Sequence, residues 1–151
     1  MALEELSCKS IGERARDQVV RTLSKMHCSC EQITANNMSF YFEGGEMFLQ
    51  HFQNSPIVKF YYWFPTVIPL DEPEMVEKAK RLVNDFNKKN TSCMSYYIFE
   101  EFNYLSVEIT HHFRVLLPRT PQLEDYLIST FRDFFSICHK FESKMFEDSI
   151  S

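Results

Sequence analysis

Residues 38–52 read MSFYFEGGEMFLQHF, with Gly44 and Gly45 between two runs that are rich in aromatic residues. Alternating apolar side chains on both sides of the glycines are typical of half-buried strands. A two-residue turn of type I′ needs positive φ at both central positions, which glycine adopts without steric cost. The stretch therefore predicts a β-hairpin whose strands span residues 38–43 and 46–52.

Two carboxylates, Glu43 and Glu46, flank this predicted turn. In the predicted register they oppose each other, and Phe40 faces Leu49 further along the hairpin. Like charges in such a pair are unfavourable unless the side chains splay into water. The alternative is a loop that holds a hard cation or supplies an acid and a base. We expect a solvated turn, because splaying at an exposed hairpin tip costs nothing.

The other elements are predicted from apolar spacing outward from the hairpin. Short aromatic and β-branched runs predict three further strands: residues 58–64, 93–99 and 105–113. Apolar stripes at helical spacing predict three helices, with start signals at Ser10, Asp71 and Thr120. Ser10 and Glu13 have the spacing of a capping box, and Thr120 is expected to cap the last helix.

This order, α-β-β-β-α-β-β-α, predicts the fold class α+β. Short connections make neighbouring strands antiparallel, so we expect a five-stranded antiparallel sheet with the helices mainly on one face. A chain of 151 residues is long enough to bury a core in one domain, which we expect to span residues 1–151.

Composition excludes several function classes. The net charge is −5, from 16 basic and 21 acidic residues, and no basic run prepares a surface for nucleic acid. No window approaches the ~20 apolar residues of a membrane span. Five cysteines, an odd number, favour reduced thiols, and residues 1–6 lack the pattern of a signal peptide. We therefore expect a cytoplasmic protein that binds neither nucleic acid nor membrane.

The element order, the YFEGGEMF hairpin, the strand at residues 58–63 and the long aromatic C-terminal helix together resemble the type III secretion chaperone-like fold. Within that fold the chain is most similar to the YbjN-type bacterial proteins. The resemblance implies a small bacterial cytoplasmic protein without a known reaction, in a fold whose secretion members dimerise and hold effector segments along their sheets. It transfers no functional residue, because sites rather than folds define function.

His27, Cys28 and Cys30 form the best candidate for metal or redox chemistry, since imidazole and thiolate are the usual zinc ligands. Structural zinc sites typically need four ligands, and this chain offers no second spaced pair of cysteines. We therefore expect no metal and no cofactor here. A small metal-binding or enzymatic protein that uses these three residues remains the alternative.

A surplus of aromatic side chains on the sheet face away from the helices points to a protein-binding surface: Tyr41, Phe48, Tyr61 and Trp63. The alternative is that loops and the proline-bearing segment at residues 65–70 cover this face and bury its aromatic side chains. Without a Gly-rich phosphate loop or a spaced nucleophile and base, we expect no enzyme. The sequence thus predicts a non-enzymatic protein–protein interaction module, chaperone-like in character, with a protein partner or a homodimer as its assembly.

Overall fold

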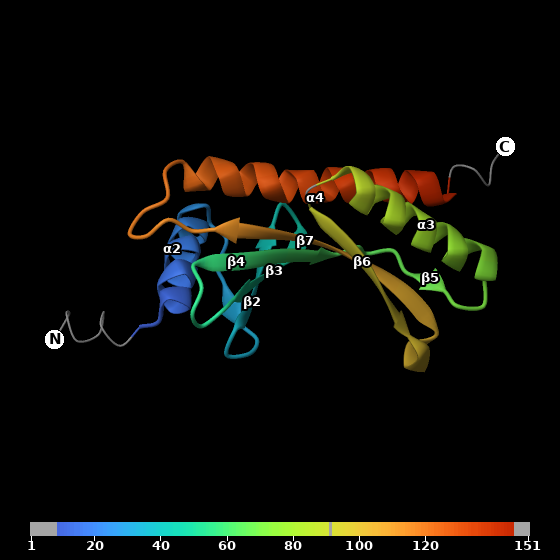
Figure 1. The fold of residues 1–151 in the computed structure, drawn as a ribbon, viewed down its shortest axis with the longest axis horizontal. Coiled ribbons are helices and arrows are strands. Elements are labelled where there is room, and N and C mark those ends of the chain that lie inside the picture. The colour runs from blue at the N-terminus through green and yellow to red at the C-terminus, as the bar shows by residue number, and fades with distance from the viewer. Residues whose placement is uncertain (1–8, 91, 147–151) are drawn as a thin grey trace. The chain divides into compact units, whose positions relative to one another are not determined.

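The computed structural model describes residues 9–90 and 92–146. The N-terminal residues 1–6 discussed above lie outside the described residues. The described residues contain three α-helices: α2 (Ile11–Lys25), α3 (Pro73–Lys89) and α4 (Leu123–Phe146). A short 3-10 helix, η1, spans Glu100–Phe102. The fold is therefore α+β, as the sequence predicted (Figure 1).

Within the part of the chain that the structure describes, seven strands form an antiparallel sheet, against the five that the sequence predicted. Five of them match the predicted runs: β2 (Asn37–Phe42), β3 (Gly45–His51), β4 (Ile57–Trp63), β6 (Cys93–Phe99) and β7 (Tyr104–Arg114). The two additional strands are β1 (Glu31–Gln32) and β5 (Ile68–Pro69). Each has two residues, which is too short for an alternating pattern to show in the sequence.

The strands are hydrogen-bonded in the order β1-β2-β3-β4-β7-β5, and β6 pairs with β7 outside this path. By their contacts the residues fall into two compact units. Unit 1 comprises residues 1–61 and 112–129, and unit 2 comprises residues 62–111 and 130–151. Strands β4 and β7 and helix α4 contribute residues to both units, and each unit is described separately below.

In unit 1 the β2–β3 hairpin is confirmed, but its turn lies one residue earlier than predicted. Glu43 and Gly44 have φ of 47° and 86°, and Gly45 is already paired with Phe42. Phe40 therefore faces Met47 rather than Leu49. Each residue of β2 is thus paired with a residue of β3 two positions earlier than predicted. Because side chains alternate between the faces of a strand with a period of two, every side chain still lies on its predicted face.

This register separates the two carboxylates that were expected to oppose each other. Glu46 faces Tyr41, and Glu43 is part of the turn itself. A Cβ atom on Gly44 would meet nothing within 4 Å, so the positive φ alone selects glycine at this position.

The capping box at the start of α2 is confirmed. The amide of Glu13 donates to Ser10 Oγ over 3.1 Å, and the amide of Ser10 donates to Glu13 Oε1 over 3.4 Å. Between them, the amide of Gly12 donates to the carbonyl of Gln53 over 3.1 Å. A Cβ on Gly12 would lie 1.7 Å from the carbonyl oxygen of Phe52, so only glycine permits this close approach.

The last helix begins later than predicted. Thr120 does not cap it, because α4 starts at Leu123 and Thr120 instead exchanges hydrogen bonds with Leu116. The loop before α4 is fixed by Gln18 of α2, which is buried. Gln18 Nε2 donates to the carbonyls of Leu116 (2.9 Å) and Pro118 (3.1 Å), and Gln18 Oε1 accepts from the Thr120 amide (2.9 Å).

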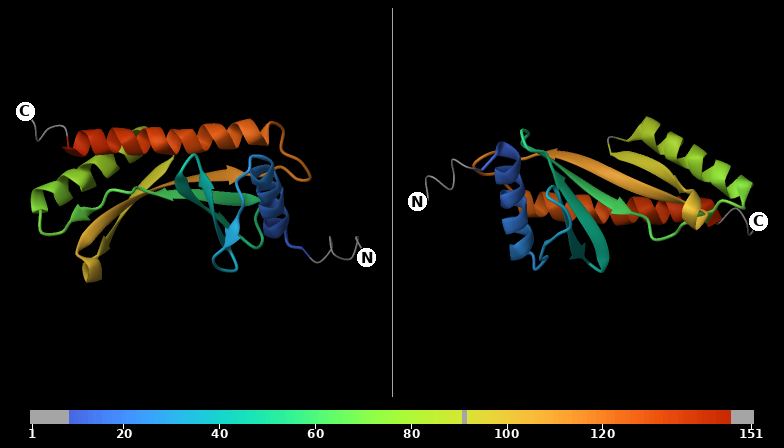
Figure 2. Two further views of the ribbon diagram at one scale, coloured as in Figure 1. Left: turned by 180° about the vertical axis from the view of Figure 1, so that it is seen from behind. Right: turned by 90° about the horizontal axis from the view of Figure 1, so that it is seen from below.

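Unit 2 places α3 and the second part of α4 on one face of β6 and β7. Figures 1 and 2 show α3 running from the neighbourhood of β5 to the start of β6. The buried side chains of this unit include Phe64, Ile68, Val83, Met94, Leu105, Val107, Ile109, Phe134 and Phe141. Met94, Val107 and Ile109 alternate along their strands with residues on the opposite face, which carries the aromatic side chains described next.

Candidate protein-interaction surface

The four residues predicted to form a binding surface are divided between the two units. Tyr41, Phe48 and Tyr61 belong to unit 1, and Trp63 belongs to unit 2. Tyr41 is 63% exposed. A hydrogen bond to the Glu46 carboxylate raises the pKa of its hydroxyl above the ordinary value, because ionisation would place two negative charges side by side.

Phe48 and Tyr61 are engaged with each other rather than presented singly. Their rings stack with centroids 5.0 Å apart and an interplanar angle of 11°. The Tyr61 hydroxyl donates to Asn37 Oδ1 over 3.0 Å, and Lys59 Nζ lies 5.2 Å from the centre of the Tyr61 ring. The outer face of unit 1 therefore carries an ordered aromatic pair with a polar surround.

In unit 2, Trp63 is part of a larger aromatic cluster. Its ring centroid lies 5.2 Å from that of Tyr97 and 6.3 Å from that of Phe99. Tyr104 continues the series, 5.3 Å from Phe99 and 6.0 Å from Phe102. These five residues, Trp63, Tyr97, Phe99, Phe102 and Tyr104, are called the aromatic cluster below. Phe102 is 66% exposed and Tyr97 is 44% exposed, so the cluster offers apolar surface to solvent.

The Tyr97 hydroxyl is held by a buried carboxylate. It lies 3.5 Å from Oε1 of Glu108, which stands on the same face of the neighbouring strand β7. The negative charge of Glu108 raises the pKa of Tyr97, so the phenol stays protonated at neutral pH. Tyr97 is thus a neutral side chain that contacts Glu108 and contributes to the exposed part of the cluster.

Strand β6 is an edge strand, because β7 is its only partner among the described strands. In an antiparallel pair, the backbone groups of successive residues point alternately toward the partner strand and away from it. The carbonyl of Val107, opposite Tyr96, accepts from the Phe64 amide on the far side of β7, and Leu105, opposite Ile98, faces β5. The N–H and C=O groups of Tyr96 and Ile98 therefore point outward, and we call these four groups the open edge.

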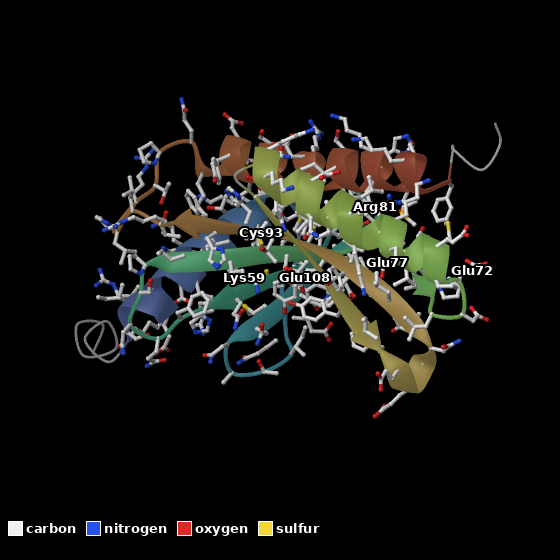
Figure 3. All side chains as sticks on the ribbon, turned by 45° about the vertical axis from the view of Figure 1, so that its right-hand side comes forward. Lys59, Glu72, Glu77, Arg81, Cys93 and Glu108 are labelled. Atoms are coloured by element: carbon white, nitrogen blue, oxygen red, sulfur yellow. The ribbon has the colours of Figure 1, made fainter. Side chains whose placement is uncertain are left out.

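Met94 lies two residues before Tyr96, and its outward N–H and C=O groups already have hydrogen-bond partners. Asn87 Nδ2 donates to the Met94 carbonyl over 2.8 Å, and the Met94 amide donates to Asn87 Oδ1 over 2.7 Å. One amide side chain from the end of α3 thus caps the first part of β6. Figure 3 shows Cys93 at this end of the strand, and α3 and β6 diverge from there toward η1. Among the described residues, no such cap is present at the open edge.

The sequence of β6, CMSYYIF, carries no charged residue. In natural proteins, charged residues, proline or short length usually prevent an edge strand from pairing with another chain. A long apolar edge strand that lacks these features is a site for such pairing. Sequence reasoning predicted this strand but missed its position at the edge. The lack of charged residues over residues 92–99 was the one feature of the sequence that could have indicated an edge available for pairing.

His27, Cys28 and Cys30, the alternative candidates for metal or redox chemistry, differ in their exposure. His27 is exposed with φ of 63°, Cys28 is buried, and Cys30 is half-buried. Burial raises the pKa of Cys28, and burial together with the adjacent Cys28 raises the pKa of Cys30 to about 11. Both thiols are therefore protonated at neutral pH, whereas the thiolate is the nucleophile and metal ligand. Within residues 9–90 and 92–146, no group of three or more His, Cys, Asp or Glu side chains is arranged to hold a metal ion.

No helix in the described part of the chain combines the length and the apolar character that a membrane span requires. In comparisons with protein-family models, curated proteins and solved structures, nothing matched this chain. The resemblance to YbjN-type proteins therefore stays a prediction.

Proposed function

We propose that this protein is a non-enzymatic protein–protein interaction module that forms a homodimer through the open edge of β6. The observation that carries the proposal is an uncharged, aromatic edge strand whose backbone groups at Tyr96 and Ile98 point away from the sheet. Main-chain hydrogen bonds to such an edge supply affinity, and neighbouring side chains supply specificity.

The open edge is complementary to a second copy of itself. In an antiparallel pair centred on Tyr97, Tyr96 of one copy is opposite Ile98 of the other, and both residues direct their backbone groups outward. Each such pair exchanges two backbone hydrogen bonds. A two-fold interface brings identical patches together, so charge on the strand would repel its own copy. The absence of charge in β6 suits this symmetric pairing.

The aromatic cluster lies beside this edge and extends the interface. Tyr97 stands opposite its own counterpart in the pair, and aromatic cross-strand pairs contribute about 0.2–1 kcal/mol each. Trp63 packs against Tyr97 of the same chain. It also contacts Phe99, which stands on the same face of β6 as Tyr97. Aromatic side chains of this kind are enriched in the buried centre of protein interfaces.

Substitution of Ile98 tests the proposal. Ile98→Pro removes the outward amide but no bond to β7, because Ile98 and Leu105 form a non-hydrogen-bonded pair. The matched control, Ile98→Ala, removes the same side chain and keeps the amide. We expect wild type and Ile98→Ala to show twice the 18.0 kDa chain mass in size exclusion with light scattering. Ile98→Pro should show the single chain mass with an unchanged circular dichroism spectrum.

Amide hydrogen exchange supplies a second measurement that needs no variant. Wild type at high concentration should protect the amides of Tyr96 and Ile98, and dilution should remove this protection while that of Tyr97 remains. A wild-type monomer at every concentration would overturn the dimer, and so would a dimeric Ile98→Pro. If the amides of Tyr96 and Ile98 are protected from exchange only when an added extended peptide binds, the open edge binds a different protein partner and not a second copy.

A further inference from the structure

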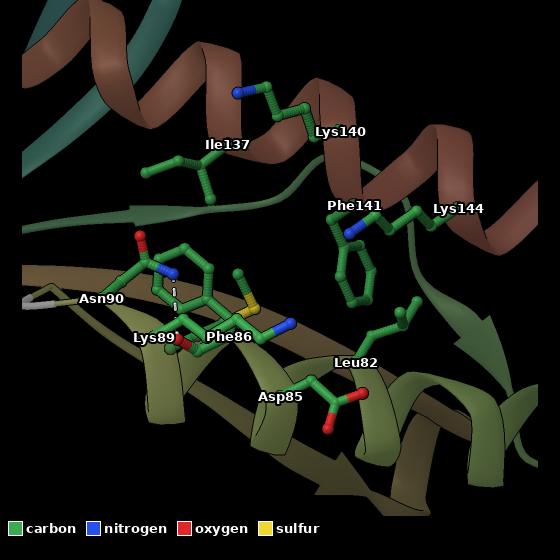
Figure 4. A pocket seen from close by; sticks show the side chains of 10 residues that line it. Leu82, Asp85, Phe86, Lys89, Asn90, Ile137, Lys140, Phe141 and Lys144 are labelled. Carbon is green, nitrogen blue, oxygen red and sulfur yellow. Dashed lines mark hydrogen bonds between the residues drawn. The ribbon is translucent and has the colours of Figure 1, made fainter.

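A pocket of about 260 Å³ lies between α3 and α4 in unit 2, on the opposite face of the sheet from the aromatic cluster (Figure 4). Its floor is apolar and is formed by five side chains: Leu82, Phe86, Met94, Ile137 and Phe141. Leu82, Phe86 and Ile137 are only half-buried. The pocket therefore leaves apolar surface open to an occupant.

The rim of the pocket is basic. Lys89 at the end of α3 and Lys140 and Lys144 on α4 line it, with Asp85 as the one acidic lining residue. The local charge is thus positive in a protein whose net charge is −5. Of the carboxylates in the described residues, none lies within ion-pair distance of these three amines. Figure 4 shows Phe141 and Leu82 reaching into the space between the helices, with the amine of Lys144 beside Phe141 and the amine of Lys140 directed along α4 away from α3.

From this arrangement we propose that the pocket binds a small amphiphilic anion, a molecule with an apolar body and one carboxylate or phosphate head. Ligand sites are typically apolar clefts with a few polar groups that fix orientation, and the lysines provide charge complementarity for an anionic head. The volume is close to the lower end of the usual range of roughly 300–1,000 Å³. It therefore fits a medium-length chain or a single ring rather than a whole membrane lipid. This site is independent of the proposed dimer edge.

Titration with decanoate tests the proposal on the full chain. We expect saturable chemical-shift changes at Met94, Ile137 and Phe141 in nuclear magnetic resonance spectra, with decanoate kept below its micelle-forming concentration. Decyltrimethylammonium has the same chain and the opposite charge, and butyrate has the same head and too little apolar body. Both should fail to bind. Decyl phosphate distinguishes the two anionic heads, because the tighter of the two ligands identifies the preferred one.

Charge reversal on the rim locates the site. Lys140→Glu and Lys144→Glu should each weaken decanoate binding about tenfold, because an attraction becomes a repulsion at a partly exposed rim. Lys88→Glu makes the same change of charge on α3 at an exposed position that does not line the pocket, so it should leave binding unchanged. Two separate rim variants keep the test valid if one fails to fold.

Three outcomes would overturn the proposal. The first is the absence of saturable shifts with both decanoate and decyl phosphate. The second is equal binding of decyltrimethylammonium, which would show that the rim contributes nothing. The third is an equal effect of Lys88→Glu and the two rim variants, which would indicate a nonspecific response to net charge.

Discussion

The hairpin turn at Glu43 and Gly44 shows how one backbone angle decides the effect of a substitution. Gly44→Val should lower the free energy of unfolding by about 1 kcal/mol or more, because a β-branched residue tolerates positive φ poorly. Gly45→Val should cost less, because Gly45 is a strand residue paired with Phe42. Urea unfolding of both variants measures the difference. Equal losses would place the turn at the two glycines, as the sequence alone suggested.

His51 gives unit 1 a pH-dependent contribution to stability. Its side chain is buried, and Nδ1 has no hydrogen-bond partner among the described residues. Burial and the nearby Arg16 guanidinium lower the pKa of His51 below 6.5, and the carboxylates of Glu13 and Asp17 and the Asn36 backbone offset part of this shift. As the pH falls below 6.5, the unfolded chain binds a proton before the folded chain does. The free energy of unfolding should therefore fall with the pH in this range.

Removing the imidazole tests this assignment. His51→Leu should flatten the dependence of unfolding free energy on pH below 6.5, since the group that titrates differently in the folded and unfolded chain is gone. Chemical unfolding at a series of pH values gives the comparison. A wild-type slope in His51→Leu would show that another group causes the dependence.

At the scale of elements, Gln18 joins α2 to the loop before α4 through three hydrogen bonds. Gln18→Glu keeps the shape but replaces the donor amide with an oxygen that faces two carbonyl oxygens. We expect a loss of about 2 kcal/mol or more in urea unfolding, because buried polar groups lose their partners. Gln53→Glu, the same change at an exposed position, should have little effect. Comparable losses in the two variants would remove the role given to Gln18.

The elements themselves were largely predictable, and the residues that join them were not. Alternation and helical spacing located five strands and three helices, because each long element shows its buried face in its own sequence. Thr120 and Pro121 matched a helix start, yet the hydrogen bonds with Leu116 and Gln18 hold Thr120 in a loop. Gln18 is distant in sequence from that loop, so no local pattern revealed the contact.

The candidate site was predictable only in part for the same reason. Tyr41, Phe48, Tyr61 and Trp63 were selected because they alternate with core residues, and all four do lie on that face of their strands. Which of these residues share a surface depends on the side chains of the neighbouring strands and on the unit to which each residue belongs. The open edge depends on the pairing of β6 with β7, and the pocket depends on the packing of α3 beside α4. The sequence of a single element contains neither.

For the whole molecule, the proposed dimer makes thermal stability depend on protein concentration. Because association stabilises only the folded chain, the melting temperature of the wild type should rise as the concentration is raised. Ile98→Pro should melt at one temperature across the same range, and Ile98→Ala should behave like the wild type. Scanning calorimetry over a wide concentration range makes this measurement. A wild-type melting temperature that does not change with concentration would contradict the dimer.

The cap that Asn87 places on Met94 also bears on how large an assembly of this chain can become. Open-ended polymers grow because each added molecule leaves another long unpaired edge behind it. The outermost strands of the main path, β1 and β5, have two residues each. Two copies joined through β6 would each have used the open edge, and the first part of that strand is already closed by α3. In a crowded cell, a higher concentration of such a protein would give more pairs and no fibres.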